Sequence, residues 1–193
     1  VSDLLLWTEI KLEKKILKDF DVSASQYLRM NKNWIGFDDY ISEVGLAYSI
    51  NKNFAIGVNG RYSRNKKYTG LSENDYRYDF NFRYERKLKE RLKLFYRLQY
   101  QKEFYDSGVF YEEVNYYQSA FRNRLKLRWQ LNNSHRFYGS GELFRLTKKS
   151  HEPYFSKCRF WIGDDILAKF GGVDLAFGIE NQLNNANPYT YYI

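Results

Sequence analysis

The sequence contains few of the residues that mark a disulfide framework or a helical membrane protein. Among its 193 residues there are two histidines, two prolines and one cysteine, Cys158, which cannot form an internal disulfide. No apolar run approaches the ~18–20 residues that a membrane helix needs. The start VSDLLLW lacks the basic residues and apolar stretch of a signal peptide, so an exported protein would be present here in its mature form.

Aromatic and charged residues are both abundant. The chain has 19 tyrosines, 15 phenylalanines and 4 tryptophans, while 28% of all residues are charged. A mean hydropathy of −0.69 is typical of a soluble protein, but so many aromatic residues are unusual beside so much charge. The net charge of +8 would suit nucleic acid or an anionic surface, and its placement along the chain matters more than its sum.

The stretch DYRYDFNFRYERKLKERLKLFYRLQYQ, residues 75–101, shows how the two kinds of residue are arranged. In its first half every second residue is aromatic, and the residues between them are charged or polar. The pattern resumes after a short turn at 87–91. A period of two over this length indicates β-strands, because successive side chains of a strand point to opposite faces.

Nearly the whole chain reads as alternating strands joined by hairpins, within a single domain over residues 1–193. We predict ten strands, at 6–16, 22–30, 40–50, 54–64, 76–86, 92–104, 119–131, 136–146, 154–167 and 173–183. Short turns rich in Asn, Asp and Gly alternate with longer loops at 31–39, 65–75, 105–118 and 147–153. Tight turns at one end and long loops at the other are typical of an outer-membrane barrel.

Three features favour a barrel whose aromatic face meets lipid over a soluble sandwich with the aromatic residues inside. Strands of about 11–14 residues exceed the usual 5–6 of soluble domains and suit a tilted span. Tyrosines lie at the ends of 76–84 and phenylalanines in the middle, as interfacial girdles require. The opposite rows are strongly charged, unlike the interior of a soluble ligand-binding barrel. The predicted lipid-facing aromatic residues are Tyr76, Tyr78, Phe80, Phe82, Tyr84, Tyr96, Tyr100 and Trp129.

The charged rows then face the lumen, which in a barrel of about ten strands is narrow. Because isolated buried charges are costly and paired ones are tolerated, we expect a dense ionic network that plugs the barrel. The predicted members of this network are Glu9, Glu13, Arg29, Glu43, Arg61, Arg77, Asp79, Arg83, Glu85, Arg97, Arg122, Arg124, Lys126, Arg128, Glu142, Arg159 and Glu180.

Several phrases carry a family resemblance: LLLWTEIKLEKKI, SINKNFAIGVNGRYSR, FRNRLKLRW, GELF and CRFWIG. They resemble an uncharacterised outer-membrane β-barrel family of Bacteroidota that is catalogued as a domain of unknown function. The resemblance covers essentially the whole chain, implies an outer-membrane location and transfers no catalytic residues to this chain. Members of that family end on a full aromatic-terminated strand, whereas NPYTYYI stops after a few residues. If the C-terminus is incomplete, the ring would hold 11 or 12 strands.

The sequence supports no enzymatic site, cofactor or metal. Omptin-like proteases use paired aspartates and an Asp-x-His; the chain has FDDY and GDDI but no Asp-x-His. Ser134 and His135 are adjacent in a tight turn, where their side chains diverge, so a polar turn is favoured over a lipid hydrolase. His151, Glu152 and Cys158 are too few and wrongly spaced for a metal site.

Nucleic-acid binding is the other function that the positive charge suggests. Arg122, Arg124, Lys126 and Arg128 form a basic stripe on one strand, but carboxylates on the neighbouring strands favour pairing within the barrel. We therefore expect no nucleic-acid partner.

The predicted role is that of an outer-membrane structural or accessory subunit of a Gram-negative bacterium. It would contact lipid, lipopolysaccharide and other outer-membrane proteins. The aromatic loop FYDSGVFYEEVNYYQ, with Phe110, Tyr111, Tyr116 and Tyr117, is the predicted partner contact, and a self-packed lid over the barrel mouth is the alternative. A narrow small-solute or anion channel along Arg122–Arg128 is the alternative function. A proteolytic or lipid-modifying enzyme is a third.

Overall fold

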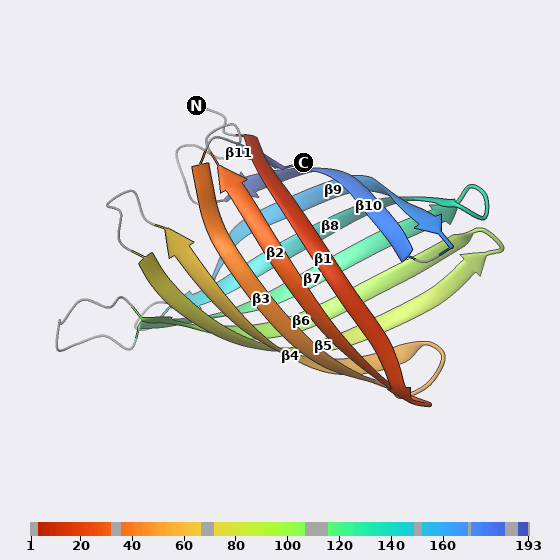
Figure 1. The fold of residues 1–193 in the computed structure, drawn as a ribbon, viewed down its shortest axis with the longest axis horizontal. Helices are drawn as coiled ribbons and strands as arrows, with labels where there is room; N and C mark the ends of the chain where they lie inside the picture. The colour runs from red at the N-terminus through yellow and green to blue at the C-terminus, as the bar shows by residue number, and fades with distance from the viewer. Residues whose placement is uncertain are drawn as a thin grey trace.

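The computed structural model of the chain is an all-β fold, and it describes residues 4–31, 36–66, 72–106, 116–148, 152–169, 171–183 and 189–192. The strands are β1 (Leu4–Leu17), β2 (Phe20–Asn31), β3 (Gly36–Ser49), β4 (Phe54–Lys66), β5 (Ser72–Lys89), β6 (Leu92–Asp106), β7 (Tyr116–Gln130), β8 (His135–Lys148), β9 (Tyr154–Ala168), β10 (Gly171–Gln182) and β11 (Tyr189–Tyr192). Each of the ten long strands pairs antiparallel with its neighbour in sequence (Figure 1). The predicted up-and-down barrel fold of about ten strands is confirmed.

Most strands are longer than their alternating pattern predicts, and the connections are correspondingly shorter. Residues 64–66 of β4, for example, continue the ladder with residues 72–74 of β5. These residues are polar on both faces, so the hydrophobic period ends before the backbone pairing does. No helix in the described part of the chain is long and apolar enough to cross a membrane.

The short strand β11 completes the ring of pairings. It pairs antiparallel with β10 over four residues and parallel with β1 at Leu4–Tyr191 and Leu5–Tyr192. Toward the tight-turn end, β1 and β10 diverge (Figure 1). Within the described residues, Leu6–Leu17 of β1 and Gly171–Phe177 of β10 have no strand paired on that side. The barrel is therefore closed by strand pairing at one end only.

Asparagine side chains build two of the tight turns. The Oδ1 atom of Asn51 accepts hydrogen bonds from the backbone N–H groups of Asn53 (2.9 Å) and Phe54 (3.0 Å). Asn132 does the same for Ser134 and His135, both at 2.8 Å. A side-chain acceptor that mimics the backbone lets the chain reverse within a few residues, so both turns follow from one residue type.

The two faces of the sheet differ as the alternation predicts. Large apolar side chains point outward along the strands, among them Phe80 (54% exposed) and Ile162 (66%). Charged and polar side chains point into the lumen, where Asp79, Glu142 and Glu180 are at most 5% exposed. The usual order of a water-soluble protein is therefore reversed.

Two inward-facing aromatic rings lie directly over glycines of the next strand. Tyr138 of β8 is paired with Gly163, and Trp161 of β9 is paired with Gly178. A Cβ atom on Gly163 would lie 2.7 Å from the Tyr138 ring, and one on Gly178 would lie 2.5 Å from the Trp161 ring. These glycines leave the space that the rings fill.

Substitution of Gly178 by alanine should destabilise the barrel by about 1–3 kcal/mol, because the new methyl group overlaps the Trp161 ring. Gly139 is the matched control, since a Cβ there meets nothing within 4 Å. Gly139→Ala should be neutral or stabilising by about 0.4–1 kcal/mol. Equilibrium urea unfolding measures both variants, and equal stabilities would contradict the close approach.

Candidate functional site: the luminal charge network

The middle of the lumen is occupied by a carboxylate held between arginines, here named the Glu142 cluster (Glu142, Arg97 and Arg122). Arg122 donates through Nε and Nη2 to the two Glu142 oxygens, each at 3.1 Å, while Arg97 Nη2 lies 2.9 Å from Oε1. Arg122 also donates to Gln101 Oε1 at 3.1 Å. Glu142 is 5% exposed, so its charge depends on these two cations.

A second group, the Glu43 cluster, joins strands β3, β4 and β5. Glu43 accepts from Arg61 Nε at 2.6 Å and from Arg77 Nη2 at 3.3 Å. Arg77 also lies 3.5 Å from Asp79, whose other oxygen accepts from Asn59 Nδ2 at 2.7 Å. Two arginines and two carboxylates therefore balance one another here.

Glu180 is the centre of a third group on β9 and β10. It is hydrogen-bonded to Arg159 and lies 3.1 Å from Lys157 Nζ. The ring of Phe144 lies beside the cations Arg122, Lys157 and Arg159, at 4.6, 5.2 and 4.9 Å from its centroid. Aromatic faces attract cations, so this inward-facing ring adds to the pairing of the network.

Strand register also brings like charges together. Arg83 of β5 is paired with Arg97 of β6, and Arg97 is paired with Arg124 of β7. We call these three residues the arginine row. On its far side Arg124 is paired with Glu142, which is paired in turn with Arg159.

Two cavities lie on either side of the Glu142 cluster. The larger, about 710 Å³, lies toward the loop end, and Arg97, Arg122 and Glu142 are in its wall. The smaller, about 390 Å³, lies toward the tight-turn end. Arg97 and Arg124 line both cavities, so these two side chains lie between them.

The tight-turn end has more cations than nearby carboxylates. Asp165 is the shared partner of Lys126, Arg128 and Arg136, at 3.8, 3.6 and 3.9 Å. These separations exceed those of hydrogen-bonded ion pairs. The Lys126 ammonium lies 3.4 Å from the centroid of the Tyr138 ring, and Tyr138 donates to Asp174 at 2.8 Å.

Of the residues predicted for the network, most lie in these groups. Arg29 pairs with Asp39 at 3.2 Å, and Glu85 pairs with Lys93 at 2.6 Å. Glu13 differs, because it is about half exposed and pairs with Lys11 of its own strand. Glu9 lines the loop-end cavity, and Arg83 lines the tight-turn cavity. Residues of the network that were not among its predicted members include Asp39, Asn59, Lys93, Gln101, Arg136, Tyr138, Phe144, Lys157, Asp165 and Asp174.

The predicted lipid-facing aromatic residues lie outside the ring, and several of them pack against other outward-facing aromatic rings. Tyr76 is 5.5 Å from Tyr62, and Tyr84 is 5.0 Å from Phe54, between ring centroids. Phe80 and Trp129 are both more than half exposed.

The predicted partner loop is only partly a loop. Tyr116 and Tyr117 begin β7 and pair with Tyr105 and Phe104, because the backbone ladder continues past the alternating stretch. Phe110 and Tyr111 lie outside the described residues.

The structure gives His135 a carboxylate partner that the sequence did not suggest. Its Nδ1 atom lies 2.6 Å from Asp164 Oδ2. The adjacent Asp165 faces the lumen, so the paired aspartates of GDDI serve different partners. Cys158 is half-buried and has no disulfide, and the described residues contain no group of three or more potential metal ligands. His151 lies outside the described residues.

Glu142→Gln should destabilise the barrel by about 3–5 kcal/mol, since it leaves Arg97 and Arg122 without their buried counter-charge. Glu13→Gln is the control, and its exposed pair should contribute less than about 1 kcal/mol. Urea midpoints of the two variants compare the effects. A Glu142→Gln variant as stable as Glu13→Gln would mean that water already screens the cluster.

No curated protein matches the chain significantly. The resemblance to a family catalogued as a domain of unknown function is confirmed to that extent. The model of the family described as "Protein of unknown function (DUF2490)" matches residues 4–192, and the chain belongs to this family.

Proposed function

We propose that the chain is an outer-membrane β-barrel of a Gram-negative bacterium, one of the Bacteroidota, with an occluded lumen. In this role it is a structural or accessory subunit that docks other envelope proteins. The observation that carries the proposal is the reversal of faces, with apolar side chains outward and ion pairs inward.

The outer wall supports a lipid environment. Val44, Phe160 and Val173, on strands around the ring, are each more than half exposed. A contiguous apolar surface of this kind far exceeds the patches that water-soluble monomers leave uncovered. The ten long strands have 12–18 residues, enough for a tilted crossing of about 9–11 residues.

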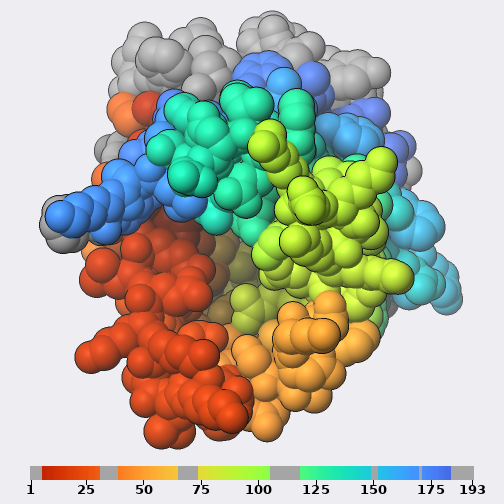
Figure 2. Space-filling view, turned by 90° about the vertical axis from the view of Figure 1, so that its right-hand side faces the viewer, coloured from red at the N-terminus to blue at the C-terminus, as the bar shows by residue number. Residues whose placement is uncertain are grey.

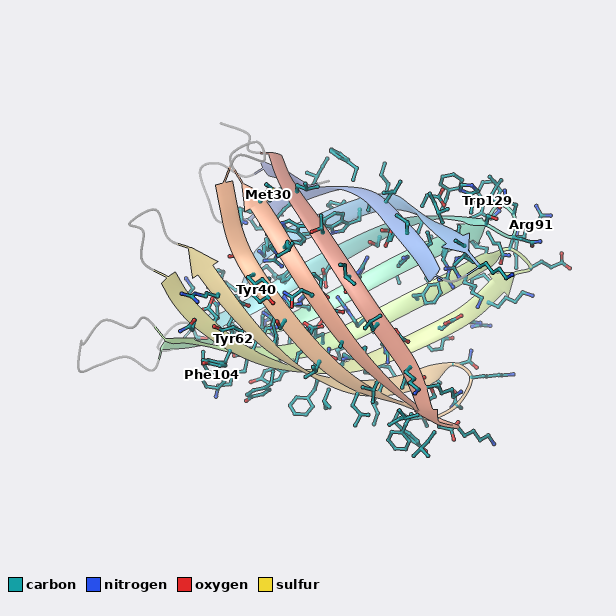
Figure 3. The ribbon with its side chains drawn as sticks, in the orientation of Figure 1. Met30, Tyr40, Tyr62, Arg91, Phe104 and Trp129 are labelled. Carbon is teal, nitrogen blue, oxygen red and sulfur yellow. The ribbon has the colours of Figure 1, made fainter. Side chains whose placement is uncertain are left out.

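Aromatic residues at both ends of the wall support the same orientation. Tyr62 and Phe104 lie toward the loop end, and Trp129 lies at the tight-turn end (Figure 3). Tyrosine and tryptophan favour the boundary between lipid and water, where an apolar ring and a polar atom are both satisfied. Lipid and lipopolysaccharide are therefore the expected surroundings of the wall.

The Glu142 cluster supports occlusion. It lies between the loop-end and tight-turn cavities, and its carboxylate is hydrogen-bonded from both β6 and β7. A barrel of this strand number has little free interior once its side chains are counted. A subunit with a filled interior acts through its wall and its ends, and the connection that contains Phe110 and Tyr111 is the proposed partner contact.

A narrow anion channel is the second candidate function. The observation that favours it is the arginine row, whose members Arg97 and Arg124 are exposed to the cavities on both sides of the cluster. An anion that displaced Glu142 from Arg97 would find a further cation, Arg124, along the path.

The wall assignment is tested at Phe80. Phe80→Arg should destabilise the barrel folded into lipid vesicles by about 2–4 kcal/mol, because it places a charge in hydrocarbon. Phe80→Leu keeps an apolar side chain and should be close to wild type. Folding that is equally stable for both variants would mean that this face meets water.

Occlusion and the accessory role are tested on protein purified in mild detergent. We expect stoichiometric co-purification with other envelope proteins, and the pure protein should show no steady conductance in planar bilayers. A steady anion-selective current from the pure protein would replace the accessory role with the channel.

A further inference from the structure

The arginine row is an arrangement that strand pairing alone would disfavour. Arg83, Arg97 and Arg124 are direct cross-strand neighbours, and like charges directly opposite one another destabilise a sheet. In the Glu180 group, by contrast, Arg159 is paired on one side with Glu142 and on the other with Glu180, and the adjacent arginines of the Glu43 cluster, Arg61 and Arg77, both contact Glu43. Three adjacent arginines therefore need a compensating partner.

The described residues supply these arginines with only some of the carboxylates and hydrogen-bond acceptors that would compensate them. Arg97 shares Glu142 with Arg122. Arg124 donates to Ser140 Oγ at 3.1 Å, and no described carboxylate lies within 4 Å of Arg124 or Arg83. The Nε atoms of Arg97 and Arg124 are buried and have no acceptor among the described residues. Hydrogen-bond donors of two neighbouring guanidinium groups are thus unused at one level of the lumen.

A cavity is present where these donors lie. Its volume is about 390 Å³, and six cationic side chains but two carboxylates line it: Lys52, Arg83, Arg97, Arg124, Lys126 and Arg128, with Asp21 and Glu85. Glu85 is already paired with Lys93 at 2.6 Å. Small residues, Ser49 and Ala55, form part of the facing wall. The tight-turn end of the molecule is hollowed at its centre (Figure 2), so a solute can reach this cavity from that end.

We propose that this tight-turn cavity binds a small, multiply charged phosphate compound, with the arginine row as its principal ligands. Guanidinium groups form paired hydrogen bonds with phosphate oxygens. The lining keeps a positive excess when Glu142, which contacts Arg97, and Asp165, which lies near Lys126 and Arg128, are counted with it, and such an excess favours a multiply charged anion such as pyrophosphate over a singly charged carboxylate. The volume lies within the range of small-molecule sites, about 300–1,000 Å³.

The site goes beyond the proposed accessory role and does not depend on it, because binding can be measured whether or not the barrel conducts. Isothermal titration of the refolded full chain in detergent with pyrophosphate, at physiological ionic strength, should give one saturable site. Arg124→Gln and Arg83→Gln should each weaken it about tenfold or more, the loss expected for a charge-assisted hydrogen bond. Arg145→Gln is the control for net charge, since Arg145 is exposed on β8 and lines neither cavity.

Stability separates a binding role of Arg124 from a structural one. Without anion, Arg124→Gln should unfold at a urea midpoint at least as high as wild type, because the substitution removes the repulsion from Arg97. Pyrophosphate should raise the midpoint of wild type and of Arg145→Gln, and raise that of Arg124→Gln far less.

A second titration distinguishes a free phosphate compound from a lipid headgroup. Monomeric short-chain phosphatidic acid that fails to displace pyrophosphate supports a soluble ligand, whereas displacement by it supports a headgroup in the same site. No saturable binding of either probe, or equal affinities in Arg124→Gln and Arg145→Gln, would overturn the proposal.

Discussion

A charge removed from water must find a counter-charge, and the interior of this barrel is organised around that requirement. Glu142 is stable as an anion because two arginines from β6 and β7 reach it. The space for such long side chains comes from the facing strands, where β3 and β4 turn small residues inward, among them Gly45, Ala47, Ala55 and Gly57. The buried ion pairs therefore depend on the small inward-facing residues that leave room for them.

The two halves of the lumen differ in how their buried cations are neutralised. Toward the loop end, Glu43 and Asp79 neutralise the two arginines of the Glu43 cluster, Arg61 and Arg77. Toward the tight-turn end, Asp165 is shared by three cations at 3.6 Å or more, and the arginine row lacks a full complement of acceptors. The positive charge of the lumen is therefore more completely neutralised toward the loop end than toward the tight-turn end.

Alternation along the chain was enough to predict the strands, their order and their two faces, since the period of two follows from strand geometry and does not depend on which side chains meet. It could not predict which arginine meets which carboxylate, because that depends on register, and register is changed by bulges such as the one between Phe144 and Arg145. The arginine row became visible only once Arg83, Arg97 and Arg124 were aligned. Phe144 was missed for another reason: aromatic residues were assigned to the wall, although its parity with Glu142 places it inside.

The glycine–aromatic pairs of β8, β9 and β10 also bear on how such a sheet assembles. Cations follow one another along β7, so a hairpin that slipped by two residues would still set a positive side chain against Glu142. Electrostatics alone would tolerate that error. A slip between β9 and β10 would instead move Trp161 from Gly178 onto Ala176 or Glu180, where the indole no longer has a vacant position beneath it. In the β9–β10 hairpin, steric fit therefore helps to specify the register.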